Sequence, residues 1–307
     1  MHFITALVLN PALIGTLSLF LAVLWMLNNP KDESRPLLVF ALVLNLFYGF
    51  LLTVFMKAEG SLFPWKFDYV LYHMDMALGV PGVAIAGALQ AIRIPLWIVY
   101  QAMIPMMICW FLVNRGRNQR GNVVLAYAVE LAAGPPLYAL LPACGPFYAF
   151  GSQWLHPQTP PLAPVGLTGM PNAFPSLHAA TALVLVFLSP NRLWRSVAVA
   201  FFAATCMATL STGEHYLIDL VPGFAFGTFA ALIGLKRYKP ALAFLGVACC
   251  WSLAVRYEYS LLAANPMVVR GGTLLTLLAL GIAAYCQRDT RQQPEPVAVA
   301  ESEILVP

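Results

Sequence analysis

The sequence is poor in charge. Asp, Glu, Lys and Arg together make up 10% of the 307 residues, whereas 60% of the residues are hydrophobic. A soluble domain carries roughly 25% charged residues, so this composition excludes an ordinary water-soluble protein. The chain also has no basic stripe with interleaved aromatic residues, and no nucleic-acid partner is expected.

Cysteine is scarce as well, and its placement predicts no disulfide framework. Five of the six cysteines fall in or at the ends of apolar runs, and only Cys144 follows such a run in a loop. The remaining five are Cys109, Cys206, Cys249, Cys250 and Cys286.

Long apolar runs are abundant. Runs of about 20 residues, the length that spans a bilayer, recur along nearly the whole chain and leave no separate soluble domain. Each run is expected to be helical, because lipid leaves unpaired backbone groups no other option. The predicted fold is therefore an all-α polytopic membrane helix bundle of about nine spans. These cover residues 4–27, 36–56, 93–113, 122–143, 175–189, 194–212, 215–235, 240–262 and 267–286.

Basic residues predict how the bundle is oriented. Twelve of the 17 Lys and Arg residues fall on one side, in the segments near residues 31–35, 115–120, 192–195, 236–239 and 288–291. By the positive-inside rule this side is cytoplasmic and the N-terminus is outside. We expect an integral protein of a bacterial inner membrane whose polar, proline-bearing tail is disordered. The outer side holds the other five: Lys57, Lys66, Arg93, Arg256 and Arg270.

Two outer segments are long enough to contribute to a site. Residues 57–90 carry aromatic residues, His73 and Asp75 in an amphipathic patch, which is typical of a helix at the lipid headgroup level. An alternative interpretation makes this segment a lid or a wall for a lipid substrate. Residues 144–174 are rich in Pro and Gly, carry no charged residue, and lead directly into the stretch NAFPSLHAATALVLVFLS.

That stretch places a polar cluster at the outer start of an apolar span. Pro175 suits a first helical position, so Ser176 and His178 are expected in the first helical turn. Free N–H groups and a partial positive charge at a helix N-terminus favour an anion such as phosphate. The hydroxyl of Ser176 adds a further donor at the same place.

The stretch STGEHYLIDLVPG supplies a second histidine at the same depth. The turn before it is short, so His215 is expected to start the next span at the outer face, near His178. Asp219 follows one helical turn later, about 6 Å deeper on the same face, where its carboxylate can accept the Nδ1–H of His215. An intramembrane carboxylate is costly and is functional by default, although an ion pair between helices is the structural alternative.

Two histidines and a carboxylate in this arrangement support phosphoryl transfer. His215 attacks phosphorus, Asp219 fixes the tautomer of His215, and His178 protonates the leaving alkoxide. Water or an alcohol activated by His178 then takes the phosphoryl group from the phosphohistidine. The sequence does not favour either acceptor over the other.

The transferring group needs positive charge, and Arg256 and Arg270 are the favoured phosphate-binding candidates on the outer side. Arg93 lies at the same face. Each of the three also fits a side chain that reaches toward lipid headgroups. Glu130 and Glu258 are partners for these arginines, or further members of the acid/base chemistry.

The motifs resemble those of the type 2 phosphatidic acid phosphatase superfamily, which reads Pro-Ser-x-His and then His-x-x-x-Asp. Here they run from Pro175 to His178 and from His215 to Asp219. The resemblance covers about residues 93–262 and implies a nucleophilic His215, an acid/base His178, no metal or other cofactor, and a six-helix core. The first motif of the phosphatases, a lysine and an Arg-Pro pair, is absent, and so is the arginine that usually precedes the third motif.

The segment YALLPACGP, together with PSLH and HYLID, is similar to the inositol phosphorylceramide synthase branch of that superfamily. That branch transfers a phospho-headgroup between lipids, and the resemblance implies that Tyr138, Gly145 and Pro146 shape the site entrance. The expected partners are a lipid phosphate or phospholipid substrate and the membrane lipids. The expected organisation is an N-terminal part (1–92), a catalytic core (93–262), and a last span with its tail (263–307).

Two other classes are weighed against this enzyme. A metal hydrolase would use His178, His215 and Asp219 as zinc ligands, but the chain supplies no extra acid as general base beside them. A lipid transporter or flippase would use the intramembrane charges as an ion relay, and it predicts two related halves. No internal repeat in motif content or loop length is found.

Overall fold

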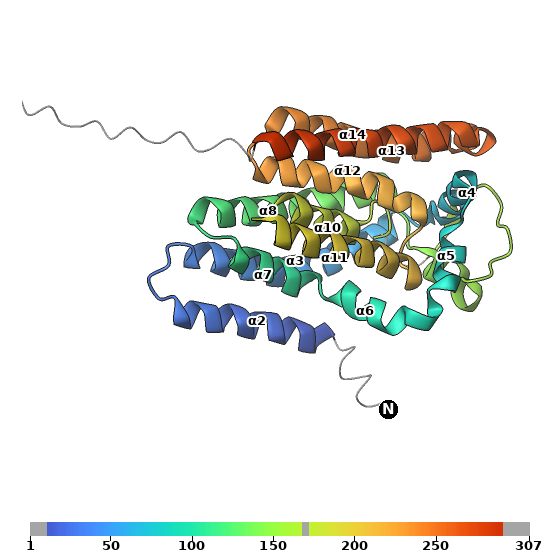
Figure 1. Ribbon diagram of the computed structural model, residues 1–307. Coiled ribbons are helices and arrows are strands. Elements are labelled where there is room, and N and C mark those ends of the chain that lie inside the picture. The colour runs from blue at the N-terminus through green and yellow to red at the C-terminus, as the bar shows by residue number, and fades with distance from the viewer. Residues whose placement is uncertain (1–10, 168–171, 291–307) are drawn as a thin grey trace, which may run out of the picture.

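The computed structural model describes residues 11–167 and 172–290, and these form an elongated bundle of helices (Figure 1). The predicted disordered tail and the start of the first predicted span lie outside the described residues. The longer helices are α2 (Pro11–Asn28), α3 (Arg35–Leu62), α8 (Arg117–Leu140), α11 (Arg192–Ser211), α12 (Leu217–Gly234), α13 (Tyr238–Ala264) and α14 (Pro266–Thr290). The shorter ones are α4 (Asp68–Leu78), α5 (Gly82–Ala88), α6 (Arg93–Gln101), α7 (Met103–Val113), α9 (Pro146–Phe150) and α10 (Leu177–Phe187), with 3-10 turns η1 (Gln90–Ile92) and η2 (Gly151–Gln153).

The all-α expectation fits the structure, and each of the nine predicted spans contains a helix. Among the described residues, α8, α11, α12, α13 and α14 are each long and apolar enough to cross a membrane. Two bent pairs raise the count to as many as seven, if each pair is one span: α4 with α5, bent by 77°, and the stretch 90–101 with α7, bent by 53°. The number nine stays a prediction.

The third predicted span, residues 93–113, is broken rather than straight. α6 ends at Gln101, and Ala102 has the non-helical angles φ −77° and ψ 5° before α7 begins. Pro105 lies in the first turn of α7 and has no N–H to donate to Gln101, so the helix cannot continue smoothly through this point.

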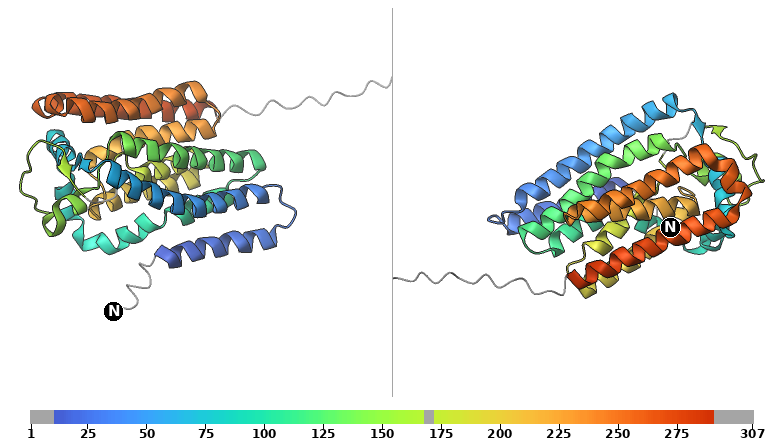
Figure 2. Two further views of the ribbon diagram at one scale, coloured as in Figure 1. Left: turned by 180° about the vertical axis from the view of Figure 1, so that it is seen from behind. Right: turned by 90° about the horizontal axis from the view of Figure 1, so that it is seen from above.

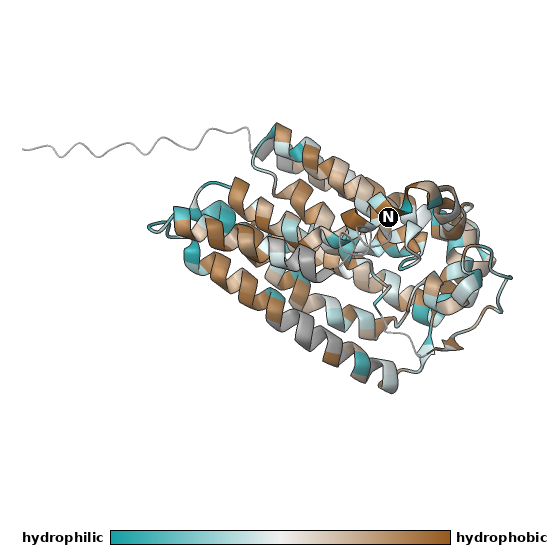
Figure 3. Ribbon diagram, turned by 90° about the horizontal axis from the view of Figure 1, so that it is seen from below, coloured by the Kyte–Doolittle hydropathy of each residue, from teal (hydrophilic) through white to brown (hydrophobic). Residues whose placement is uncertain are grey.

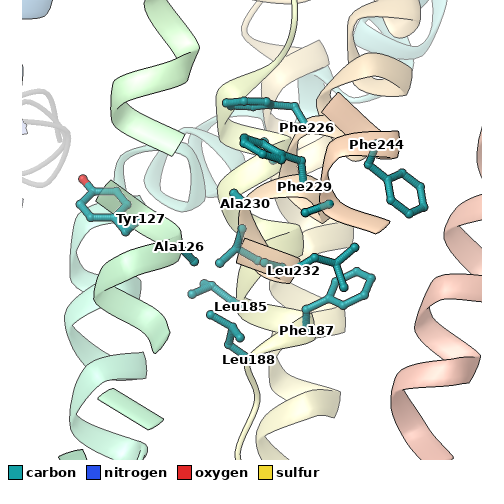
Figure 4. Packing of buried hydrophobic residues seen from close by; sticks show 14 of the residues in the cluster. Ala126, Tyr127, Leu185, Phe187, Leu188, Phe226, Phe229, Ala230, Leu232 and Phe244 are labelled. Atoms are coloured by element: carbon teal, nitrogen blue, oxygen red, sulfur yellow. The ribbon is translucent and has the colours of Figure 1, made fainter. Parts of the chain in front are cut away.

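α12 is the central helix of the bundle. Of its apolar window, 83% is buried inside the protein, against 11% for α14. Figure 4 shows Phe226, Phe229 and Leu232 of α12 among apolar residues of α10, α8 and α13. α13 and α14 lie on one side of the bundle and α2 on the other (Figures 1 and 2).

Two glycines let α12 touch α10 backbone to backbone. A Cβ atom on Gly223 would lie 2.7 Å from the carbonyl oxygen of Ser176, and one on Gly227 would lie 2.5 Å from that of Ala180. Small residues four apart on a helix allow such close approach. The contact sets the start of α10 directly beside the start of α12.

The charged loops between the N-terminal helices gather at one end of the bundle. Arg120 Nη1 lies 2.6 Å from Asp32 Oδ2, and Arg117 Nη1 lies 3.6 Å from Glu33 Oε2. Both pairs join the loop after α2 to the start of α8. Figure 3 shows that hydrophobic residues dominate along the helices, while these loops are hydrophilic. The starts of α10 and α12 lie at the opposite end, with α4 and α5 (Figure 1).

The interfacial-anchor interpretation does not describe α4, because this helix is buried in the protein. It packs against α12, α13 and α14, and Asp68 and Asp75 are 0% and 1% exposed. A short antiparallel pair, β1 (Trp65–Lys66) with β2 (Val165–Gly166), ties the segment to the long loop that precedes α10. The segment therefore forms a wall beneath the two helix starts.

Candidate active site

His178 and His215 come together at the end of the bundle that holds α4 and α5. Their ring centroids are 6.2 Å apart, with the rings inclined by 63°. Reacting atoms approach to about 3–3.5 Å before bond formation, so one phosphorus atom between the rings lies within reach of both. The structure brings the two histidines together as the sequence predicts, and their common depth in the membrane stays a prediction.

His215 lies just before α12 rather than in it. Tyr216 has extended angles, φ −81° and ψ 159°, and α12 begins at Leu217. The connection from α11 therefore runs through residues 212–216, three residues longer than the gap of 213–214 between the predicted spans.

A backbone carbonyl, and not Asp219, fixes the tautomer of His215. Nδ1 lies 2.7 Å from the carbonyl oxygen of Ala173, which can only accept, so Nδ1 carries the hydrogen. The nearest oxygen of Asp219 is 3.6 Å from Nδ1, beyond ordinary hydrogen-bond length, and it accepts from the N–H of Tyr216 at 2.7 Å. Nε2 of His215 is left with its lone pair, as the sequence predicts, but through a different partner.

Burial keeps His215 in its neutral form. The side chain is 3% exposed, and burial lowers the pKa of His215 to about 4. The hydrogen bond with Ala173 and the charge of Glu214 oppose this shift without cancelling it. The imidazole is therefore unprotonated at neutral pH, which is the form that can act as a nucleophile.

Ser176 joins the two helix starts. It is the N-cap of α10, and its Oγ accepts from the N–H of Ala179 at 3.4 Å. Its own N–H donates to the carbonyl of Asp219 at 3.1 Å. Pro175 therefore precedes the helix instead of opening it, and the first turn of α10 begins at Leu177.

His178 stacks on an aromatic ring contributed by α6. The ring centroids of His178 and Tyr100 are 3.9 Å apart and the rings are nearly parallel, at 18°. This contact packs the imidazole against α6. Tyr100 was not predicted as a site residue, although it lies about two helical turns after Arg93 in a segment predicted to start at the same face.

Two buried aspartates of α4 hold the backbone around His215. Asp75 accepts from the N–H groups of Leu217 and Ile218 at 2.9 and 2.8 Å, and from Gly82 at 2.9 Å. Asp68 accepts from the N–H groups of Cys144 and Gly145 and from the hydroxyl of Tyr216. From the sequence, Asp75 was predicted only as part of an amphipathic patch, and Asp68 was not predicted to have a role. Their seven-residue spacing, which places them on one helical face, was the available signal.

Arg256 and Arg270 contact helix ends. Nη1 of Arg256 donates to the carbonyls of Leu140 and Ala139 at 2.7 and 3.3 Å, at the end of α8. Nε of Arg270 donates to the carbonyl of Ala77 at 2.8 Å, at the end of α4. Cations at helix C-termini stabilise the helix dipole. These contacts give both arginines a structural role, and phosphate binding by either stays a prediction.

The charge of Arg93 acts on Glu214, the residue before His215. Burial raises the pKa of Glu214, and the charges of His215 and Arg93 act against that rise. Glu214 directly precedes His215, so Arg93 lies near the histidine loop. This makes Arg93 a better candidate for the phosphate group than Arg256 or Arg270.

The residues expected at the site entrance lie around the histidines. Tyr138 is buried and lines a cavity of about 230 Å³ that also contains His178. Gly145 has φ +94°, and a Cβ there would lie 2.3 Å from the carbonyl oxygen of Glu214, so the backbone approach requires glycine. Pro146 is buried at the first position of α9. Tyr138 thus belongs to the cavity, while Gly145 packs against the backbone of the histidine loop.

Within the described part of the chain, no group of three or more His, Cys, Asp or Glu residues is arranged to hold a metal ion. Asp219 is occupied by the N–H of Tyr216, and Nδ1 of His215 by a carbonyl. These two contacts hold the backbone, while Oδ1 of Asp219 has no hydrogen-bond partner among the described residues and Nε2 of His215 keeps its lone pair.

The family model of the PAP2 superfamily matches residues 70–233, which is more than half of the 307 residues. The match runs from α4 into α12 and includes both histidines. No curated protein and no solved structure matches the chain significantly. Members of the superfamily are generally phosphatases or phosphotransferases. The chain belongs to the PAP2 superfamily, and this membership indicates a membrane lipid phosphatase-type function.

Proposed function

We propose that the protein is a lipid phosphatase or lipid phosphotransferase that works through a phosphohistidine on His215. The observation that carries this proposal is the pair of imidazoles whose centroids are 6.2 Å apart, one of them with its tautomer set by the carbonyl of Ala173. Membership of the PAP2 superfamily agrees with this chemistry.

In the first step, the lone pair on Nε2 of His215 attacks phosphorus. The P–O bond to the lipid breaks, and His178 gives a proton to the departing oxygen. Nδ1 of His215 keeps its hydrogen, held by Ala173, so the phosphorylated ring is cationic. In the second step His178 takes a proton from water or an alcohol, whose oxygen displaces Nε2 and restores neutral His215.

Charge on the transferring group is balanced by the start of α10 and by Arg93. The first N–H groups of a helix lack intrahelical partners and carry a partial positive charge, and the hydroxyl of Ser176 can donate as well. Asp75 and Asp219 occupy the start of α12, so α10 is the helix that offers this site. This charge balance fits transfer of a phospho-headgroup between lipids as well as hydrolysis of a lipid phosphomonoester.

Labelling of the enzyme tests this proposal. Purified protein is incubated briefly with phosphatidic acid or phosphatidylinositol carrying ³²P and quenched in alkali, which preserves phosphohistidine. We expect an acid-labile label in the wild type, its loss in His215→Ala, and slower formation and slower decay of the label in His178→Asn. His156→Ala in the exposed loop is the matched control and keeps the label. A transporter gives no label, and a label retained in His215→Ala contradicts the proposal.

We also propose that the histidines face the exterior. The loop after α2, the start of α8 and the C-terminal end of α14 then face the cytoplasm. The uneven distribution of basic residues supports this orientation. An impermeant thiol reagent applied to intact cells should label Ser152→Cys, beside α9, but not Gln119→Cys, at the start of α8; both positions are exposed. The reverse pattern contradicts the orientation.

A further inference from the structure

The two histidines of the site are held in different ways. Nδ1 of His215 lies 2.7 Å from the carbonyl oxygen of Ala173, and this contact fixes a proton on one ring nitrogen. Among residues 11–167 and 172–290, neither ring nitrogen of His178 has a hydrogen-bond partner. Its imidazole instead contacts two other rings, those of Tyr100 and His215. The orientation of His178 therefore depends on ring contacts.

The ring of Tyr100 covers one face of the His178 imidazole. The two centroids are 3.9 Å apart and the planes are inclined by only 18°, so the rings overlap face to face. The nitrogens of an imidazole and their protons lie in the plane of the ring. A stack therefore restricts the directions in which His178 can give or take a proton, and it leaves both nitrogens open for that exchange.

Tyr100 is itself supported by a second aromatic ring of α6. Trp97 lies three residues earlier, on the same face of the helix, and the centroids of the two rings are 5.7 Å apart at an angle of 15°. Stacked aromatic pairs stabilise each other beyond the area that they bury. The imidazole of His178 thus packs against a pair of rings fixed on one helix, and not against a single isolated side chain.

The break between α6 and α7 places the ring of Tyr100. This residue is the second-last of α6, directly before the break, and the stretch 90–101 is bent by 53° from α7. α7 packs against α8 and α10, whereas α6 packs against α11. A straight helix through residues 93–113 would carry Tyr100 along the axis of α7. The break gives α6 a direction of its own, in which its end reaches the first turn of α10.

The proposed reaction makes two demands on His178. It gives a proton to the leaving oxygen in the first step and takes one from water or an alcohol in the second, so its ring has to keep one direction in both charge states. A tyrosine face meets both demands. The stack does not depend on the charge of the imidazole, and the negative face of an aromatic ring attracts the cationic form.

We propose that Tyr100 is a positioning residue for the acid/base histidine, and that the stacked rings of Trp97 and Tyr100 hold His178 in the direction that proton transfer requires. This proposal rests on the proposed phosphohistidine function. Tyr100 exchanges no proton and forms no bond to the substrate, so it acts only through His178. The ring carries this role, and the hydroxyl does not.

The two steps of p-nitrophenyl phosphate turnover separate this role from a general structural one. The phosphoenzyme forms without a proton from His178, because p-nitrophenolate leaves unprotonated, whereas its decay needs His178 as a base. Rapid quenching in alkali measures both rates with saturating ³²P-labelled ester. In Tyr100→Leu we expect formation within about twofold of the wild type and decay slower by about tenfold or more, a part of the roughly 10²–10⁴-fold that a positioned base contributes. Tyr100→Phe, which keeps the ring, retains both rates.

Further variants show whether Tyr100 acts through His178. In the His178→Asn background, Tyr100→Leu should slow decay no further, because the two residues act as one unit. Trp97→Leu should slow decay by a smaller factor than Tyr100→Leu. The matched control, Phe202→Leu, removes a ring that packs 5.1 Å from Phe224 of α12 and leaves both rates unchanged. Equal slowing of formation and decay in Tyr100→Leu, unchanged decay, or a further loss in the double variant overturns the proposal.

NMR separates failure of the stack from failure of the proposed function. The chain has only five histidines, so the Cε1–H signal of His178 in histidine-labelled protein can be assigned by its loss in His178→Asn. The stacked ring shifts this signal upfield, and Tyr100→Leu should move it downfield. A signal that stays in place overturns the proposal. Absence of a phosphoenzyme in the wild type overturns the proposed function, and with it the positioning role, while an upfield signal still shows the stack.

Discussion

Replacing Asp75 by Asn should loosen the backbone that carries His215. The carboxylate accepts from Gly82, Leu217 and Ile218 at 2.8–2.9 Å. An asparagine keeps one acceptor oxygen and turns an amino group toward N–H donors. One or two charge-assisted hydrogen bonds are lost, each worth about 1.5–3 kcal/mol, so the free energy of unfolding should fall by roughly 2–5 kcal/mol.

Thermal unfolding of the detergent-solubilised protein measures this change. A loss of 1 kcal/mol lowers the melting temperature by about 2–4 °C in a chain of 150–250 residues, so a drop of at least about 5 °C is expected for Asp75→Asn. The rate of His215 phosphorylation should fall as well, because Leu217 and Ile218 follow that residue closely.

His73→Gln is the matched control for Asp75→Asn. His73 lies on the same helix, and its Nε2 contacts the carbonyl of Pro160, in the loop before α10, instead of the start of α12. The His73→Gln variant should therefore phosphorylate His215 at nearly the wild-type rate. Wild-type melting and phosphorylation in Asp75→Asn would refute the role assigned to its carboxylate.

Three further perturbations follow from the site. The first uses p-nitrophenyl phosphate, whose leaving group needs no proton. Phosphoenzyme formation should persist as the pH falls and decline only near pH 4, because burial lowers the pKa of His215 to about 4. A decline near pH 6.5 would contradict this expectation. Between pH 6.5 and 4 the unfolded state alone gains this proton, so stability falls by up to about 3 kcal/mol as the pH drops. Gly227→Val should abolish phosphoenzyme formation, because a Cβ there lies 2.5 Å from the carbonyl of Ala180, whereas Gly246→Ala, in open space, should not. EDTA should leave activity intact; loss that Zn²⁺ restores would show a metal enzyme.

Much of the fold was predictable because the membrane imposes a simple pattern. Apolar runs located helices in all nine predicted segments, and the motif spacing placed His178 and His215 together. The break between α6 and α7 was missed, although Pro105 offered a signal. Hydropathy averages over the local sequence and does not register one missing N–H.

The local partners of His215 were less predictable. Helical spacing alone assigned its Nδ1–H to Asp219, but Tyr216 is extended, and the acceptor is Ala173, 42 residues earlier in the chain. The roles of Asp68 and Asp75 also depend on long-range contacts with backbone N–H groups, which leave no pattern in the local sequence. Contacts of this kind require the tertiary structure.

The most direct test of the central claim is a structure of the purified protein with orthovanadate, a mimic of the transferring phosphoryl group. We predict vanadium bonded to Nε2 of His215, with an oxygen on its opposite side in hydrogen-bond contact with the ring of His178 and with Nδ1 of His215 still bound to the carbonyl of Ala173. Vanadate seated elsewhere, or bound with both imidazoles turned away from it, would contradict the account.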